Sequence, residues 1–170
     1  MAEPAMMILL LVSTWFDIRT KKIPNLLIIV GLFFVIAYTG YSGGFSKIIY
    51  AVAMCILTIA LFFPLFRLHG IGAGDIKLLA LIAALHGMER LLYVSFVMFT
   101  CAGIYILWKL WHTGLIWRRL QYFVWYFCFG RYMGEVYFDP ERDEDGIQVI
   151  LAPFATIGYF IICIERWWTQ

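Results

Sequence analysis

Residues 48–79 read IIYAVAMCILTIALFFPLFRLHGIGAGDIKLL and contain two apolar runs separated by a glycine-rich stretch. The first run, residues 48–66, is almost entirely apolar, and the second begins directly after Asp75. An apolar helix of about 20 residues is long enough to cross the hydrocarbon core of a bilayer. The stretch therefore predicts a membrane helix, a short turn that carries one carboxylate, and a second helix that begins at that carboxylate.

The composition of the whole chain predicts an integral membrane protein. Of the 170 residues, 64% are hydrophobic and 14% are charged, whereas soluble domains are about half apolar and about a quarter charged. The net charge of +2 is too small to indicate a nucleic-acid partner. We expect the lipid bilayer to be the surroundings of most of the chain, and the sequence leaves the oligomeric state open.

The cysteines and histidines do not have the spacing of a metal site. No two cysteines form a CxxC pair, and the three histidines show no ligand spacing. We therefore expect no metal, no cofactor and no disulfide framework. The residues concerned are Cys55, Cys101, Cys128, Cys163, His69, His86 and His112.

Six apolar stretches predict an all-α fold, a polytopic helical bundle with six transmembrane helices. Three of the stretches are shorter than a full membrane crossing, and flanking residues or burial inside the bundle can complete such spans. We expect residues 1–170 to form a single membrane-embedded domain, with a cytoplasmic or interfacial connection at about 112–147. The expected spans are Pro4–Phe16, Asn25–Tyr38, Lys47–Phe66, Asp75–His86, Arg90–Trp111 and Gln148–Trp168.

The distribution of basic residues predicts the orientation of this bundle. Of the 13 Lys and Arg residues, ten lie at or beyond the C-terminal ends of the first, third and fifth spans, and the other three are Lys47, Arg90 and Arg166. Cytoplasmic loops carry the excess of Lys and Arg. The first, third and fifth loops are therefore expected in the cytoplasm, with both termini outside.

Residues 115–138 leave two alternatives open. This segment, LIWRRLQYFVWYFCFGRYMGEVYF, is rich in aromatic residues and also carries Arg118, Arg119 and Arg131. Aromatic rings and basic side chains are both favourable at the membrane interface. We expect a helix that lies in the cytoplasmic interface, and the alternative is a seventh span.

Two of the five aspartates are expected at one membrane face. Asp17 ends the first span and Asp75 begins the fourth, so the topology places both at the cytoplasmic face. An ionisable residue at membrane depth is costly and is therefore a functional candidate. Asp75 also has a structural explanation, because aspartate is a favoured N-cap. Asp17 lies near a helix C-terminus, where a negative charge is unfavourable.

Two adjacent carboxyl groups favour acid–base chemistry on a peptide bond. When they lie about 3 Å apart they share one proton, so that one can act as a base on water and the other as an acid toward a carbonyl. Gly72 and Gly74 precede Asp75. As an active-site loop, they would let a substrate backbone approach closely and would permit backbone angles that other residues resist.

Three stretches make the chain similar to a known family. DIRTKKIPN (17–25), GAGDIKLLA (72–80) and LAPFATIGY (151–159) resemble, in order and spacing, motifs of the type IV prepilin peptidases, including the archaeal preflagellin peptidases. These are GxGD-type membrane aspartic proteases with six spans. The resemblance covers nearly the whole chain.

The resemblance implies a reaction and its residues. Asp17 and Asp75 take the catalytic positions, and Gly72 and Gly74 take those of the loop. Lys77, Arg19, Pro24 and Asn25 match motif positions that could support the site. The implied reaction removes the short basic leader peptide of a prepilin-like or preflagellin-like precursor at the cytoplasmic face. N-methylation of the product is not expected, because the chain lacks the paired cysteines of the larger bacterial members.

Two other classes of function remain as alternatives. Membrane carboxylates also serve as proton relays, so the chain could be a small proton-coupled transporter. It could also be a non-catalytic membrane protein of pilus or secretion assembly, in which case both aspartates would be dispensable. Cleavage of a precursor distinguishes the peptidase from both.

Overall fold

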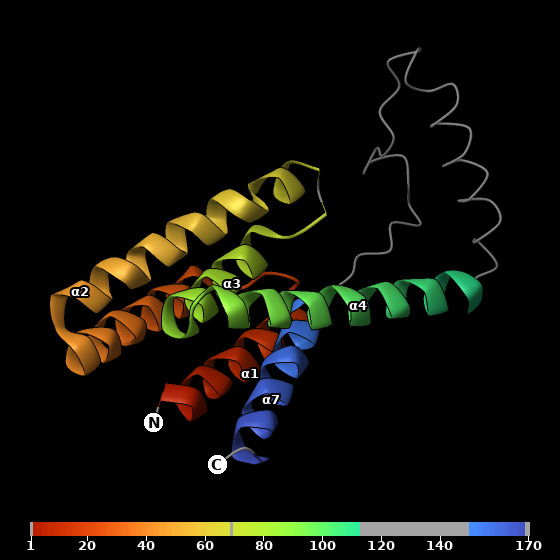
Figure 1. Cartoon of the computed structure of the whole chain (residues 1–170). Coiled ribbons are helices and arrows are strands. Elements are labelled where there is room, and N and C mark those ends of the chain that lie inside the picture. Colours follow the sequence, from red (N-terminus) through yellow and green to blue (C-terminus); the bar gives the residue numbers. More distant parts are fainter. Residues whose placement is uncertain (1, 69, 113–149, 169–170) are drawn as a thin grey trace. The chain divides into compact units, whose positions relative to one another are not determined.

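The computed structural model describes residues 2–68, 70–112 and 150–168, and these residues are helical apart from short connections (Figure 1). The predicted all-helical fold is therefore confirmed for the described residues. The alternatives for residues 115–138 lie outside them. The helices are α1 (Ala2–Thr20), α2 (Asn25–Arg67), α3 (Ala73–His86), α4 (Met88–His112) and α7 (Ala152–Trp168).

Helix α2 contains two of the predicted spans. Its backbone leaves helical geometry at Gly43 and Gly44, and Gly44 has a φ of 65°, which glycine adopts at no steric cost. Figure 1 shows α2 as two arms that meet at a bend. The bend lies between the predicted spans Asn25–Tyr38 and Lys47–Phe66, so each span corresponds to one arm.

Two of the described helices, Asn25–Arg67 and Met88–Lys109, are long and apolar enough to cross a membrane. Many large apolar side chains on the described helices face outward, among them Leu26, Phe33 and Phe96. Large exposed apolar surfaces are rare on soluble monomers, whereas lipid-facing helices require them. The number of crossings and the orientation of the termini stay predictions.

The chain divides into two compact units, Met1–Thr100 with Ile150–Gln170, and Cys101–Val149. In the first unit α3 packs mainly against α2, and α1 packs mainly against α7. Residues from both ends of the sequence therefore belong to one unit. The candidate site lies entirely within it.

Helix α3 forms the core of the first unit. Apart from Lys77, all residues from Ile76 to Ala84 are buried. With 14 residues and a rise of 1.5 Å per residue, α3 is about 21 Å long, which is shorter than a hydrocarbon core of about 30 Å. Burial against α2 explains why this short apolar helix is stable.

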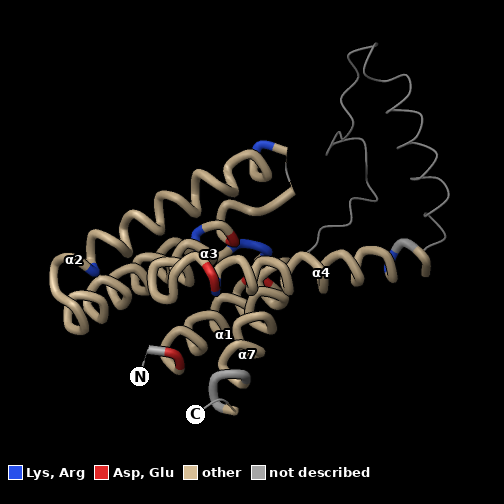
Figure 2. Tube along the Cα trace, in the orientation of Figure 1, with Lys and Arg blue, Asp and Glu red and all other residues tan. Residues whose placement is uncertain are grey.

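Charged residues are sparse along the helices. Figure 2 shows long uncharged stretches, with most Lys, Arg, Asp and Glu residues at helix ends and connections. Charges are expensive inside the hydrocarbon region and acceptable at its edges. The position of the charged residues at helix ends therefore agrees with the membrane protein that the composition predicts.

Gly158 lets α7 approach the backbone of α4. A Cβ at this position would lie 3.1 Å from the carbonyl oxygen of Val94. Because a backbone atom cannot easily move away, we expect Gly158→Leu to lower the free energy of unfolding by about 1–3 kcal/mol. Thermal unfolding of the detergent-solubilised protein measures this loss. Gly103→Leu is the matched control, because a Cβ at Gly103 meets nothing within 4 Å; equal stability of the two variants would contradict the prediction.

Candidate active site

Asp17 lies in the last turn of α1 and is held from two sides. Its side chain is 8% exposed, and the backbone N–H of Ala152, the first residue of α7, donates a hydrogen bond to its carboxylate. Lys21 terminates α1 in the left-handed region, with φ 53°, and its N–H donates to the Asp17 carbonyl oxygen at 2.8 Å. A helix N-terminus favours an anionic group. Helix α7 therefore compensates the unfavourable position of Asp17 at the C-terminus of α1.

Asp75 lies in the first turn of α3 but is not its N-cap. The N-cap is Gly72, and its backbone N–H donates a hydrogen bond to the Asp75 carboxylate. This geometry resembles the return contact of a capping box, in which the third helical residue bonds back to the cap. The expectation that Asp75 itself caps the helix is therefore wrong by three residues.

The structure brings the two carboxylates into electrostatic contact. The charge of Asp17 acts on the Asp75 carboxyl group, although the two residues are 58 positions apart in the sequence. The Oδ1 atom of Asp75 is buried and has no hydrogen-bond partner within the described part of the chain. A buried polar atom without a partner is costly and is a typical feature of a functional site. This oxygen can share a proton with a neighbouring carboxyl group or bond a bound molecule.

Of the two roles predicted for Gly72 and Gly74, close approach of another group and unusual backbone angles, the structure contradicts the second. Gly74 lies inside α3, and neither residue has a positive φ, so the expectation of unusual backbone angles in a loop is wrong. Both positions need a glycine because a neighbouring side chain occupies the space that a Cβ would take. A Cβ on Gly72 would lie 2.9 Å from Oδ2 of Asp75, and a Cβ on Gly74 would lie 3.0 Å from Cδ1 of Ile23. The glycines therefore allow the Asp75 carboxylate and the segment between α1 and α2 to pack closely on the start of α3.

Three of the supporting candidates lie where the two motifs meet. The Nζ of Lys77 donates a hydrogen bond to Oδ1 of Asn25 at 3.0 Å, which joins α3 to the start of α2. Pro24 is the N-cap residue of α2. These contacts, together with that of Gly74 with Ile23, hold DIRTKKIPN against GAGDIKLLA.

The Arg19 side chain contacts the ring of Trp15. Its guanidinium carbon lies 4.4 Å from the centroid of the Trp15 ring, on an exposed part of α1. Arginine and tryptophan at helix ends are typical of membrane interfaces. Arg19 is therefore better explained as an interfacial anchor.

The contribution of α7 to the site was not predicted in detail. Besides the Ala152 amide, α7 provides Thr156, whose Oγ1 lies 2.7 Å from Oγ1 of Thr14 one turn before Asp17. A proline at the second helical position, Pro153, was the available signal, because proline marks helix starts and a helix start offers free N–H groups. No signal in the sequence indicated that these groups face Asp17.

The fold and the site together define a class of protein, an apolar helical protein in which two carboxyl groups at the ends of two helices interact electrostatically and a third helix contacts one of them. Comparison with known proteins identifies the family. Residues 5–107 match the type IV leader peptidase family, so the matched region includes Asp17 and Asp75 and covers more than half of the chain. The chain belongs to this family, and it is a peptidase of the leader peptidase type. No curated protein and no solved structure matches the chain.

Proposed function

We propose that the chain is a membrane-embedded aspartic endopeptidase with Asp17 and Asp75 as its catalytic residues. The observation that carries this proposal is the buried Oδ1 of Asp75, which has no hydrogen-bond partner in residues 2–68, 70–112 and 150–168 and belongs to a carboxyl group on which the charge of Asp17 acts. A purely structural Asp75 would need only the contact with Gly72. The second carboxylate and the unpaired oxygen are both accounted for by chemistry on a peptide bond.

The two carboxyl groups act as one unit that holds a single proton. The ionised carboxylate removes a proton from a water molecule, and the water oxygen bonds to the carbon of the scissile carbonyl. The protonated carboxyl group donates its proton to the carbonyl oxygen. When this tetrahedral intermediate collapses, the C–N bond breaks and the leaving nitrogen takes a proton from the pair. One hydroxyl group of the intermediate gives its proton back to the pair as it becomes the carbonyl of the new carboxyl group, so the pair again holds a single proton.

We infer that the substrate is the short basic leader of a prepilin-like or preflagellin-like precursor. Family membership supports a precursor of this type, and the Lys and Arg distribution supports cleavage at the cytoplasmic face of a prokaryotic plasma membrane. The apolar helix of the precursor would stay in the bilayer. We expect cleavage without N-methylation of the product, because the chain lacks paired cysteines. Residues 1–170 would act as one peptidase domain.

Cleavage in proteoliposomes tests this proposal. The purified protein is reconstituted with a precursor that carries a basic leader followed by an apolar helix. We expect a single cut at the junction, with the leader in solution and the helix in the membrane fraction, which mass spectrometry of both fractions shows. Proton flux without cleavage would instead favour the transporter. An intact precursor with no flux would favour the assembly protein.

A further inference from the structure

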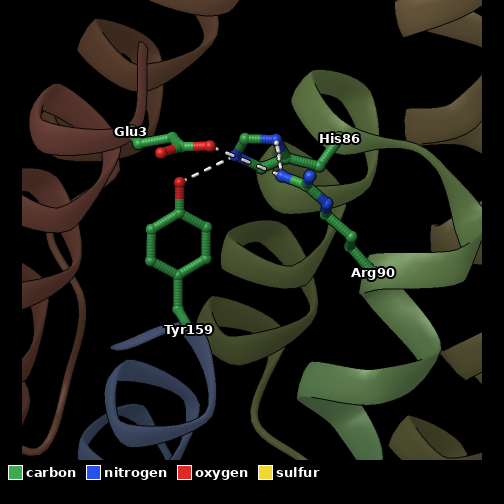
Figure 3. Close-up of polar contacts among 4 residues, drawn as sticks. All are labelled: Glu3, His86, Arg90 and Tyr159. Carbon is green, nitrogen blue, oxygen red and sulfur yellow. Dashed lines mark hydrogen bonds and ion pairs between the residues drawn. The ribbon is translucent and has the colours of Figure 1, made fainter. Parts of the chain in front are cut away.

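Four polar residues join four helices in a second cluster away from the carboxylates (Figure 3). Glu3 lies in the first turn of α1, His86 in the last turn of α3, Arg90 in the first turn of α4 and Tyr159 in α7. Arg90 Nη1 lies 3.6 Å from Glu3 Oε1 and 3.1 Å from His86 Nδ1. His86 Nε2 lies 2.7 Å from the Tyr159 hydroxyl oxygen. We call these four residues the distal clamp.

The hydrogen-bonding capacity of the distal clamp sets the direction of its bonds. A guanidinium group can only donate, so Nδ1 of His86 accepts from Arg90. In a neutral imidazole the other nitrogen then carries the hydrogen, and Nε2 donates to Tyr159. Tyr159 is 1% exposed, and a buried hydroxyl without a partner is costly. Arg90, His86 and Tyr159 therefore form one ordered chain of hydrogen bonds.

The distal clamp connects two helix pairs that have limited packing between them. Helix α1 packs mainly on α7, and α3 packs mainly on α2, whereas α1 and α3 have far less contact. The His86–Tyr159 bond joins α3 to α7, and the Arg90–Glu3 ion pair joins α4 to α1. Arg90 also bonds His86, so the two links are themselves connected.

The same helices carry the candidate active site at their other ends. Helix α1 has Glu3 in its first turn and Asp17 in its last, and α3 has Asp75 in its first turn and His86 in its last. Tyr159 follows Ala152, the partner of Asp17, by about two helical turns. Because helices are stiff, a link at one end restricts sliding and tilting at the other. Direct packing of α1 on α3 is limited, so the position of Asp17 relative to Asp75 has two supports: the contacts of DIRTKKIPN with GAGDIKLLA near the site, and this link at the opposite ends of the helices.

We propose that Glu3, His86, Arg90 and Tyr159 are positioning residues that hold α1 and α7 against α3, so that Asp17 stays beside Asp75. This inference rests on the proposed function of the aspartate pair. The distal clamp does not touch the substrate or the reacting atoms. Its loss should therefore reduce the rate of the bound complex and leave precursor binding unchanged.

The first test is kinetic. Tyr159→Phe removes one hydroxyl group, and Glu3→Gln removes one charge, with little change in shape. Each is expected to lower kcat at least about fivefold, the factor that corresponds to one buried hydrogen bond, with KM for the precursor within about twofold. The double variant should lose less than the product of the two single losses, because both weaken one clamp. Tyr93→Phe, which removes the hydroxyl of a tyrosine that is 41% exposed, is the matched control.

The second test does not depend on cleavage. Spin labels on Ile18→Cys and Leu68→Cys, two exposed positions at the Asp17 end of α1 and at the end of α2, report the distance between the two helix pairs in a chain whose native cysteines are replaced by alanine. We expect a broader or shifted distance distribution in Tyr159→Phe and Glu3→Gln than in Tyr93→Phe.

Unchanged kcat and unchanged distances in both clamp variants would overturn the inference, and so would a raised KM at constant kcat. The results differ if the proposed peptidase function itself is wrong. In that case the unmodified chain does not cleave, or Asp75→Asn still cleaves, while the spin-label distances still respond to the clamp variants.

Discussion

Asp75→Asn is expected to lower the rate of precursor cleavage by about a thousandfold or more, within the range that acid–base groups contribute. Asparagine keeps the shape of aspartate and can still accept the hydrogen bond from the Gly72 backbone N–H. It therefore preserves the start of α3 and removes only the ability to carry and transfer a proton. A cleavage time course with reconstituted protein measures the effect.

Asp17→Asn is expected to have an effect of similar size for the same reason. The amide oxygen can still accept the hydrogen bond from the Ala152 N–H, so the contact between α1 and α7 is kept. Glu89→Gln is the matched control, because it exchanges an exposed carboxylate in the first turn of α4 for an amide. Near-normal cleavage by Asp75→Asn would show that this residue serves only to stabilise the first turn of α3.

Gly74→Leu is expected to reduce cleavage by about a hundredfold or more, because it separates the two motifs that form the site. A Cβ on Gly74 would lie 3.0 to 3.2 Å from three side-chain atoms of Ile23, one of which is Cβ. An atom so close to the backbone cannot rotate away, so the segment between α1 and α2 must shift. Overpacking of this kind costs about 1–3 kcal/mol, and catalysis is more sensitive than stability to such displacements.

A second substitution, at Ile23, tests whether displacement of the segment between α1 and α2 causes the loss of cleavage in Gly74→Leu. In the double variant Gly74→Leu with Ile23→Ala, the larger side chain has room, so we expect a substantial part of the lost cleavage to return. Ile23→Ala alone completes the double-mutant cycle. If the loss of activity in the double variant equals the product of the two single losses, the contact between Gly74 and Ile23 does not position the carboxylates.

The helices could be predicted from the sequence because their signal is local. Apolar runs interrupted by short polar or glycine-rich stretches indicate helices in a membrane. Five of the six predicted spans lie within helices of the structure, and α7 begins at Ala152, inside the sixth predicted span, Gln148–Trp168. The details at helix ends were less predictable. The prediction placed the N-cap of α3 at Asp75, whereas the structure has it at Gly72, because the return hydrogen bond of Asp75 depends on the three-dimensional path of the turn.

The site could be predicted only in part. The two aspartates were singled out because a carboxylate in an apolar chain is costly, and the distribution of basic residues placed both at one face. The prediction that Gly72 and Gly74 provide backbone freedom was wrong. Close approach was also predicted, but the sequence did not show that the neighbouring groups are the Asp75 carboxylate and Ile23. Arg19 and Lys77 were treated alike, but one lies on Trp15 and the other bonds Asn25.

The sequence by itself determined that the chain is an apolar helical protein, that Asp17 lies near the end of one helix and Asp75 near the start of another, and which family these motifs belong to. These properties depend on local composition and on short motifs. Only the tertiary structure decided that the amide of Ala152 holds Asp17 and that His86 and Tyr159 join the helix pairs. It also decided that Oδ1 of Asp75 is buried with no hydrogen-bond partner among the described residues. The physical reason is that hydrogen bonds between distant segments depend on how whole helices pack, and helix packing leaves no periodic pattern in the sequence that identifies the partners.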